Sequence, residues 1–316
     1  MKLYIGLLFV MLQQSVFSFV KDTLVVAKDG TGNFTSLQEA IQSLPSFPSE
    51  RQFIYVKKGI YYEKVVLPEW NPNVTIIGED ANHTIISFDD HFDKVNKGRN
   101  STFYTPTLLV AADDVLLKNL TIENSSGDVG QAIALSITSH RVRVVGCRIL
   151  GNQDTLYLSG TGKKYFFNCH IEGTTDYIFG NAPVFFEECT LHSKKDSYIT
   201  AASTPEHQEY GFVFSKCQLT SESNLTKLYL GRPWRPYATT VFLHCFIEAP
   251  IAPQGWHPWN QPEAEMKVFY AEFKNYGPGS IVENRVGWCQ QLTSSQAKKF
   301  TKIKILNDGT DWYTSI

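Results

Sequence analysis

The sequence has little net charge and few charged residues of either sign. Its formal net charge is −2 over 316 residues, and Asp, Glu, Lys and Arg together make up 19%. A chain this close to neutrality creates no strong field for nucleic acid phosphates or anionic lipids. Hydrophobic residues make up 43%, which is ample for a core. The composition therefore argues against a nucleic-acid partner and indicates a folded chain.

Long hydrophobic runs are lacking after the N-terminus. Residues 1–18 hold one lysine, a short apolar run and small residues at the −3 and −1 positions before a cleavage site after Ser18. This order is typical of a secretory signal peptide. A membrane anchor would need about 20 apolar residues, and Gln13 and Gln14 interrupt the run too early. We expect a signal peptide over residues 1–18 and one secreted domain over residues 19–316, extracellular or periplasmic, without membrane contact.

Apolar stripes of helical period are also lacking from most of the chain. Instead one short phrase recurs: a polar residue or glycine, a small or apolar residue, any residue, then Ile or Leu. It begins at residues 119, 146, 168, 188, 216 and 244, so the spacings are 27, 22, 20, 28 and 28 residues. Repeats of this length indicate a solenoid whose coils bury one another. We predict an all-β fold, a right-handed parallel β-helix.

The two ends of the solenoid are expected to differ from its middle. A capping helix is predicted over residues 34–44, with Thr35 as its N-cap and Gln38 three residues further on. Its apolar face consists of Leu37, Ala40, Ile41 and Leu44. After Gly277 the periodicity weakens, and we expect this segment to pack back along the outside.

Five of the six cysteines occupy one phase of the repeat. They are Cys147, Cys169, Cys189, Cys217 and Cys245. In an exported chain the default interpretation is a set of disulfides. However, side chains stacked in parallel strands lie about 4.8 Å apart and do not converge, whereas a disulfide needs Cβ atoms about 3.8 Å apart. We therefore predict a ladder of buried, mostly reduced thiols.

Two aspartates share a second phase of the repeat. Asp154 follows Cys147 by seven residues, and Asp176 follows Cys169 by seven residues. Residues at equal phase in adjacent coils lie about 4.8 Å apart, so these carboxyl groups are predicted to be neighbours. Two adjacent carboxyls tend to divide into one ionised and one protonated member. Such a pair can supply both the nucleophile and the general acid for the hydrolysis of an ester.

Two glutamines are predicted to face the same cleft. Gln153 follows Cys147 by six residues, and Gln131 reaches the same phase once the five extra residues of its longer coil are allowed for. Their amides can stabilise an oxyanion without a metal ion. Taken singly, each feature has a structural explanation, since Asp satisfies turn amides and Gln forms ladders. A segment such as 232–234 can also be a plain turn with an exposed aromatic.

Taken together, five motifs resemble those of the pectinesterases, also called pectin methylesterases. They are GIYYE at residues 59–63, QAIAL at 131–135, QDTL at 153–156, DYIFG at 176–180 and LGRPW at 230–234. They stand in the order found in the family. Two positions depart from its pattern: Tyr177 stands where Phe is usual, and Arg235 begins a segment in which the family varies. The Tyr177 side chain is expected to point to the interior, where its hydroxyl needs a partner.

The resemblance implies catalytic roles for five residues. Asp176 would be the nucleophile and Asp154 the general acid and base. Gln131 and Gln153 would donate to the oxyanion. Arg232 would keep the Asp176 carboxylate ionised and oriented.

The resemblance also implies a sugar-binding groove lined by Trp234 and Phe179, with Thr102 near the ester. Pectin, as methyl-esterified homogalacturonan, would be the substrate of a monomeric enzyme without metal or cofactor. Pectate lyases and polygalacturonases share the fold and the polymer, but they need a calcium cluster or an acid pair flanking the glycosidic bond. A carbohydrate-binding module would need no convergent catalytic set. Because only two acids converge here, the sequence favours the esterase.

Overall fold

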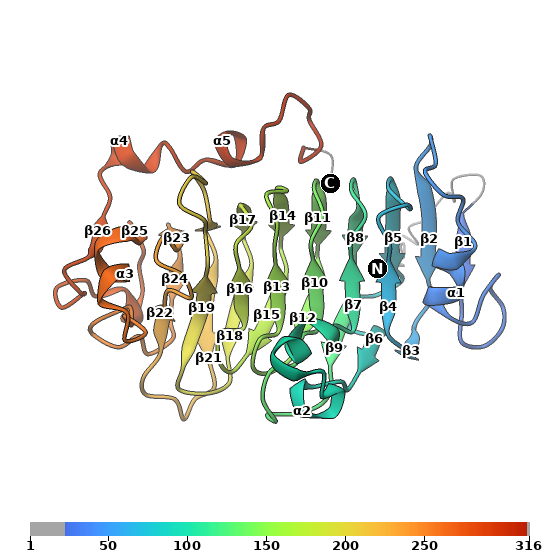
Figure 1. The fold of residues 1–316 in the computed structure, drawn as a ribbon, viewed down its shortest axis with the longest axis horizontal. Coiled ribbons are helices and arrows are strands. Elements are labelled where there is room, and N and C mark those ends of the chain that lie inside the picture. The colour runs from blue at the N-terminus through green and yellow to red at the C-terminus, as the bar shows by residue number, and fades with distance from the viewer. Residues whose placement is uncertain (1–22, 315–316) are drawn as a thin grey trace, which may run out of the picture.

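Parallel strands wind into three long sheets around one axis (Figure 1). The computed structural model describes residues 23–314, so the predicted signal peptide lies outside the described residues. Successive coils stack in register, with Ile149 between Ile122 and Ile171. The predicted parallel β-helix is confirmed.

Each complete coil gives one strand to each sheet. Sheet A consists of β1 (Leu24–Val26), β2 (Gln52–Val56), β5 (Val74–Gly78), β8 (Leu116–Lys118), β11 (Val142–Val145), β14 (Lys164–Phe167), β17 (Val184–Glu187), β20 (Phe212–Ser215), β23 (Thr239–Leu243), β25 (Phe269–Phe273) and β26 (Cys289–Gln291). Sheet B consists of β3 (Gly59–Tyr62), β6 (Thr84–Phe88), β9 (Thr121–Asn124), β12 (Arg148–Leu150), β15 (His170–Gly173), β18 (Thr190–Ser193), β21 (Gln218–Ser221) and β24 (Phe246–Ile247). Sheet C consists of β4 (Val65–Leu67), β7 (Leu108–Val110), β10 (Leu135–Ile137), β13 (Leu156–Leu158), β16 (Ile178–Gly180), β19 (Tyr198–Ala202) and β22 (Tyr229–Gly231).

The helices are short and lie outside the coils. They are α1 (Leu37–Gln42), α2 (Phe92–Val95), α3 (Pro262–Lys267), α4 (Ser294–Ala297) and α5 (Lys302–Leu306), with 3-10 segments η1 (Gly98–Tyr104) and η2 (Pro278–Ser280).

The first residue of each repeated phrase forms the corner between sheets A and B. Its backbone is left-handed, with φ between 50° and 59° at residues 119, 146, 168, 188, 216 and 244. The N–H of each corner residue donates to the next coil, as Asn168 does to the Glu187 carbonyl at 3.1 Å. Asn and Gly adopt this conformation readily, whereas Lys216 does so against its steric preference. The corner explains the polar start of the phrase, because this side chain projects to solvent.

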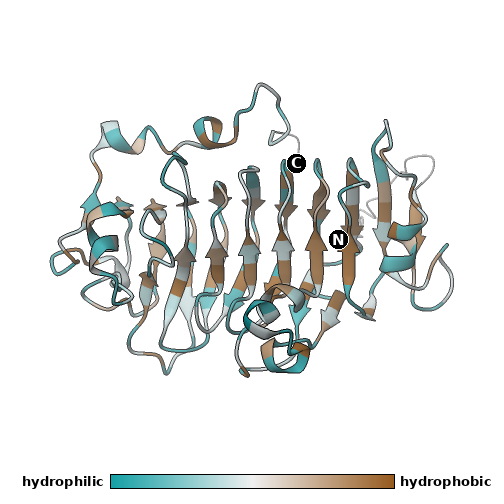
Figure 2. Ribbon diagram, in the orientation of Figure 1, coloured by the Kyte–Doolittle hydropathy of each residue, from teal (hydrophilic) through white to brown (hydrophobic). Residues whose placement is uncertain are grey.

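The interior contains two columns of stacked side chains. The five cysteines of the repeat are free and buried, which matches the predicted ladder. Four phenylalanine rings stack beside them, with successive centroids 4.9, 4.5 and 4.5 Å apart, at Phe166, Phe186, Phe214 and Phe242. Hydrophobic residues follow the strands along the whole solenoid (Figure 2). These columns give each coil a continuous apolar core.

Helix α1 covers the first coils, as predicted, but its N-cap is Ser36 rather than Thr35. The Ser36 side chain accepts from the Glu39 N–H at 3.3 Å. The side chain of Gln38 bonds the Val66 backbone instead of closing a capping box. Glu63, the last residue of GIYYE, accepts from Ser36 Oγ and from two amides of the first turn. The motif thus fixes the cap, because a carboxylate favours a helix N-terminus.

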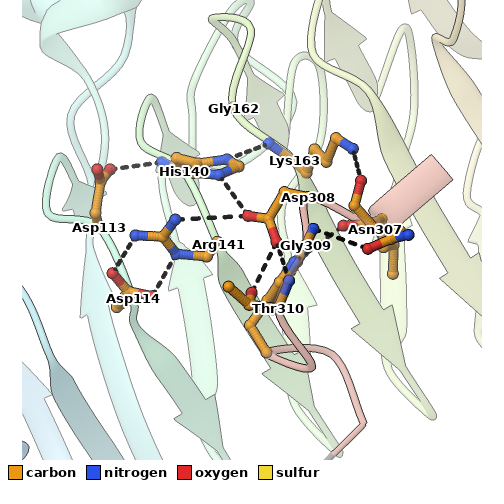
Figure 3. Close-up of polar contacts among 12 residues, drawn as sticks. Asp113, Asp114, His140, Arg141, Gly162, Lys163, Asn307, Asp308, Gly309 and Thr310 are labelled. Carbon is orange, nitrogen blue, oxygen red and sulfur yellow. Dashed lines mark hydrogen bonds and ion pairs between the residues drawn. The ribbon is translucent and has the colours of Figure 1, made fainter. Parts of the chain in front are cut away.

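The C-terminal segment packs back along the outside of sheet A, as predicted (Figure 1). Figure 3 shows the polar clasp at its end, where Asp308 Oδ2 contacts His140 Nε2 at 3.0 Å and Arg141 Nη1 at 3.5 Å. Arg141 also binds Asp114 of the neighbouring coil through two hydrogen bonds. His140 Nδ1 accepts from the Lys163 N–H at 3.0 Å. The clasp therefore ties the end of the chain to three successive coils.

Candidate active site

Asp154 and Asp176 stand at the corner between sheets B and C in adjacent coils. They precede β13 and β16, which pair with Leu156 beside Ile178. Both have left-handed backbones, with φ values of 65° and 50°. The Asp154 N–H donates to the next coil, at 3.0 Å from the Thr175 carbonyl. Such backbones are uncommon outside glycine and often mark functional sites. The structure therefore brings the two aspartates together, as their spacing predicted.

Gln131 and Gln153 pair at the same corner. An isolated parallel bridge joins them, and the N–H of Ala132 donates to the Gln153 carbonyl at 3.1 Å. Both side chains line the cleft that contains the aspartates. Two amide groups are therefore available to a substrate oxygen beside the carboxyl pair.

Arg232 binds Asp176 through both of its carboxylate oxygens. Its Nε donates to Oδ1 at 3.0 Å and its Nη2 to Oδ2 at 2.6 Å. The guanidinium lies between two aromatic rings, 4.0 Å from the Tyr198 centroid and 3.7 Å from the Trp259 centroid. Bidentate pairing and stacking on both faces fix its plane, which in turn fixes the plane of the carboxylate.

Burial raises the pKa of both carboxyl groups, but their surroundings differ. Burial and the negative charge of Asp176 raise the pKa of Asp154 well above its usual value, against the charge of Arg232. Burial also raises the pKa of Asp176, while the hydrogen bonds and charge of Arg232 oppose that rise. Since Arg232 contacts Asp176 directly, Asp176 is the member that ionises first. Asp154 then holds the remaining proton.

The cleft has a volume of about 370 Å³. All eight residues that the sequence proposed for the site line it: Thr102, Gln131, Gln153, Asp154, Asp176, Phe179, Arg232 and Trp234. Thr102 is contributed by η1, which lies outside the repeat. Trp234 packs against Phe179 with centroids 6.0 Å apart. Aromatic rings beside buried polar groups form the kind of surface that binds sugars.

Sequence reasoning missed several aromatic residues of this site. Tyr157 lies beside Phe179 in the sheet, with ring centroids 4.8 Å apart. Each follows its aspartate by three residues, so the shared offset could have identified Tyr157. Trp259 and Phe103 line the cleft itself, whereas Tyr157 packs against the lining residue Phe179. Trp259 and Phe103 come from segments outside the repeat, where the sequence carries no periodic signal.

Tyr177, where the resemblance had led us to expect Phe, points to the interior. It is fully buried, and its hydroxyl lies 3.0 Å from Ser193 Oγ. The substitution therefore adds a polar group together with its hydrogen-bond partner.

Residues 23–314, the part of the chain that the structure describes, lack two kinds of feature. Within that range, no three His, Cys, Asp or Glu side chains are arranged to hold a metal ion. No helix in the same range is long and apolar enough to cross a membrane.

Comparisons with known proteins give one consistent result. A profile of the pectinesterase family matches residues 23–309. The chain is 39% identical to putative pectinesterase 11 of Arabidopsis thaliana, over 91% of this chain and 79% of that protein. It superposes on the pectin methylesterase from carrot with a TM-score of 0.86 and 32% identity, covering 92% of this chain and 94% of that one. A pectin methylesterase variant solved with a hexasaccharide gives a TM-score of 0.79 at 29% identity, covering 91% and 97%.

Proposed function

The chain belongs to the pectinesterase family, and from this premise we propose that it demethylates pectin with Asp176 as nucleophile and Asp154 as general acid and base. It is a pectin methylesterase, a carboxylic ester hydrolase that converts galacturonan methyl esters to carboxylates and methanol. The observation that best supports the proposed roles is the bidentate Arg232–Asp176 pair, one coil from Asp154.

The first half of the reaction forms an acyl-enzyme. An ionised oxygen of Asp176 attacks the ester carbonyl carbon, and the carbonyl oxygen becomes an oxyanion. The amides of Gln131 and Gln153 donate to that oxyanion. When the bond from carbon to the methoxy oxygen breaks, Asp154 gives its proton to the methoxide and methanol leaves. An anhydride now joins Asp176 to the galacturonyl group, and Asp154 is ionised.

The second half returns the enzyme to its starting state. Asp154 takes a proton from water while the water oxygen attacks the galacturonyl carbon. The same two amides stabilise the second oxyanion. Its collapse breaks the anhydride, so Asp176 leaves as a carboxylate that Arg232 again holds. The product acid releases its proton to solvent, so one proton is produced for each ester hydrolysed.

The surroundings of the two carboxyl groups support the roles proposed for Asp176 and Asp154. A nucleophile must be ionised, and Arg232 opposes the rise in the Asp176 pKa. A general acid must be protonated, and both burial and Asp176 raise the Asp154 pKa. The two roles would exchange only if the guanidinium contacted Asp154 instead.

The groove supports a sugar polymer as substrate. Phe179 and Trp234 lie beside the carboxyl pair, and Thr102 contributes to the wall of the cleft. We propose that galacturonan rings pack on these aromatic faces while the ester enters between the aspartates and glutamines. We also propose export through the signal-like residues 1–18 and action as a monomer.

Product analysis tests the proposed function. The mature chain, incubated with highly methylated pectin, should release methanol and leave the polymer length unchanged. No unsaturated product absorbing in the ultraviolet and no new reducing ends should appear. Ultraviolet-absorbing products without methanol would instead identify a lyase, and new reducing ends without methanol would identify a glycosidase.

A further inference from the structure

His257 contacts both aromatic residues that lie against the Arg232 guanidinium. The Tyr198 ring lies on one face and the Trp259 ring on the other. The His257 ring meets Tyr198 at a centroid distance of 5.1 Å and an angle of 61°. Its Nδ1 also accepts a hydrogen bond from the backbone N–H of Trp259 at 3.0 Å. His257 therefore touches both halves of the aromatic sandwich without lining the cleft.

The strained backbone at Trp259 needs a stabilising hydrogen bond of this kind. Trp259 and Asn260 have consecutive left-handed conformations, with φ values of 51° and 52°. A large side chain in this region strains the backbone, and the surroundings must compensate for that strain. The bond from the Trp259 N–H to the side chain two residues earlier has the pattern of an Asx-turn, with the His257 ring nitrogen in place of an Asn oxygen.

The surroundings of His257 keep its ring neutral. Burial lowers the pKa of His257, and the positive charges of Arg232 and Lys227 lower it further. Among the described residues, the phenols of Tyr198 and Tyr229 also pack against the ring, at 5.1 and 5.4 Å between centroids. A neutral imidazole whose Nδ1 accepts carries its proton on Nε2. Protonation would place a second proton on Nδ1 and remove the acceptor.

We propose that His257 is a positioning residue for the esterase reaction: it holds the Trp259 ring on Arg232 and thereby fixes the plane of the Asp176 carboxylate. A backbone hydrogen bond places His257 beside Arg232. The His257 N–H donates at 3.1 Å to the carbonyl of Gly231, the residue before Arg232. This inference rests on the role proposed for Asp176. Protonation of His257 Nδ1 would therefore also loosen the sandwich.

Two nearly isosteric variants test the acceptor. His257→Asn keeps an acceptor for the Trp259 N–H and cannot titrate, whereas His257→Leu keeps a similar volume and removes the acceptor. At neutral pH the Asn variant should retain kcat within about threefold. The Leu variant should lose about tenfold in kcat, which corresponds to one net hydrogen bond, with KM changed less than twofold.

Hydrogen exchange gives a readout that does not depend on catalysis. The amide of Trp259 should be protected in the wild type and in His257→Asn, and it should exchange faster in His257→Leu. Equal kcat and equal protection in the two variants would overturn the proposal. If His257→Leu does not fold, His257→Ala takes its place, and a Trp259 amide as protected in His257→Ala as in the wild type overturns it. If the Trp259 amide is protected as expected but Asp176→Ala remains active, the error lies in the proposed mechanism and not in the role of His257.

Discussion

Asp154 and Asp176 each combine a left-handed backbone with a carboxyl group removed from water. Both the left-handed backbone and the burial of the carboxyl destabilise the folded chain. Arg232 offsets part of this for Asp176 through two hydrogen bonds. No described residue forms a hydrogen bond with the Asp154 side chain, so Asp154 is the more destabilising member. Such a residue is retained for its chemistry and not for folding.

Asp154→Asn should therefore raise stability while abolishing catalysis. A carboxyl whose pKa is raised in the folded state loses stability as pH rises from its unfolded pKa towards the folded one. The gain in melting temperature should be larger at pH 7 than at pH 3, where both states are protonated. At pH 7 we expect a gain of at least about 2 °C and a loss of methanol release of more than about 100-fold. An equal gain at both pH values would contradict the buried, protonated carboxyl.

Gln153→Ala should remove one oxyanion donor. Loss of a single donor typically costs about 10²–10³ in kcat, and KM should change little because the donor acts on the transition state. Steady-state kinetics on methylated pectin measures both constants. Gln218→Ala, at an exposed position of β21, is the matched control and should keep wild-type kinetics. A change confined to KM would show that Gln153 binds ground-state substrate instead.

Among the elements, the corner between sheets A and B explains why the repeat could be read from the sequence. One left-handed residue turns the chain, and the next residue enters the core. This local rule holds in coils of different length, because loops elsewhere absorb the extra residues. The phase of Asp154 and Asp176 follows from the same rule. The N-cap of α1 does not, since Ser36 and Glu63 meet only in the folded structure.

The cysteine ladder predicts a thiol count. All six cysteines are free, and burial raises the pKa of the ladder thiols Cys147, Cys169, Cys189 and Cys217, which suppresses reactivity. Titration with a thiol reagent in denaturant, without reductant, should find close to six thiols per chain. The native protein should react far more slowly. Two or fewer thiols in denaturant would restore a disulfide framework.

The C-terminal clasp should contribute stability but not activity. Its hydrogen bonds with Thr310, His140 and Arg141 lower the pKa of Asp308 to about 2, against a raising effect of burial. A lowered pKa means that this stability is present above about pH 4 and is lost as pH falls towards 2. Asp308→Ala should lower the melting temperature by about 2 °C at pH 7, from about 1 kcal/mol after solvent screening.

The same substitution should leave kcat unchanged and have no effect on melting near pH 2. Asp311→Ala, an exposed carboxylate of the same segment, is the control. A loss of activity in Asp308→Ala at a temperature where the protein is folded would mean that the clasp reaches the cleft.

At the scale of the whole molecule, the solenoid converts sequence distance into contact. Arg232 reaches Asp176 across 56 residues because each lies near sheet C, two coils apart. The spacing of the repeats alone predicted which periodic residues share the cleft: Gln131, Gln153, Asp154 and Asp176. Arg232 was not, and it came from resemblance to a family motif. The coil that contains Arg232 is longer than the coils that contain the two aspartates, so the position of Arg232 within the repeat cannot be counted from Cys217.

The rest of the site could not be predicted from spacing because it lies outside the repeat, and Thr102 came only from the family resemblance. Thr102 and Phe103 enter the cleft from η1, and Trp259 enters from a segment after the last strand of sheet C. Their positions depend on loop conformations and on long-range packing against Arg232. No spacing rule in a single sequence contains that information.

The central claim is that Asp176 attacks the ester, and Asp176→Ala tests it most directly. The variant removes the attacking atom and little packing, so it should fold and bind pectin, with a lower melting temperature because the partly buried Arg232 loses its ion-pair partner. Asp128→Ala, at an exposed carboxylate on a loop next to the corner, is the control and should keep full activity. Methanol release from methylated pectin is the measurement. Folded Asp176→Ala should show no detectable turnover, and activity above a few per cent of the wild type would rule out Asp176 as the nucleophile.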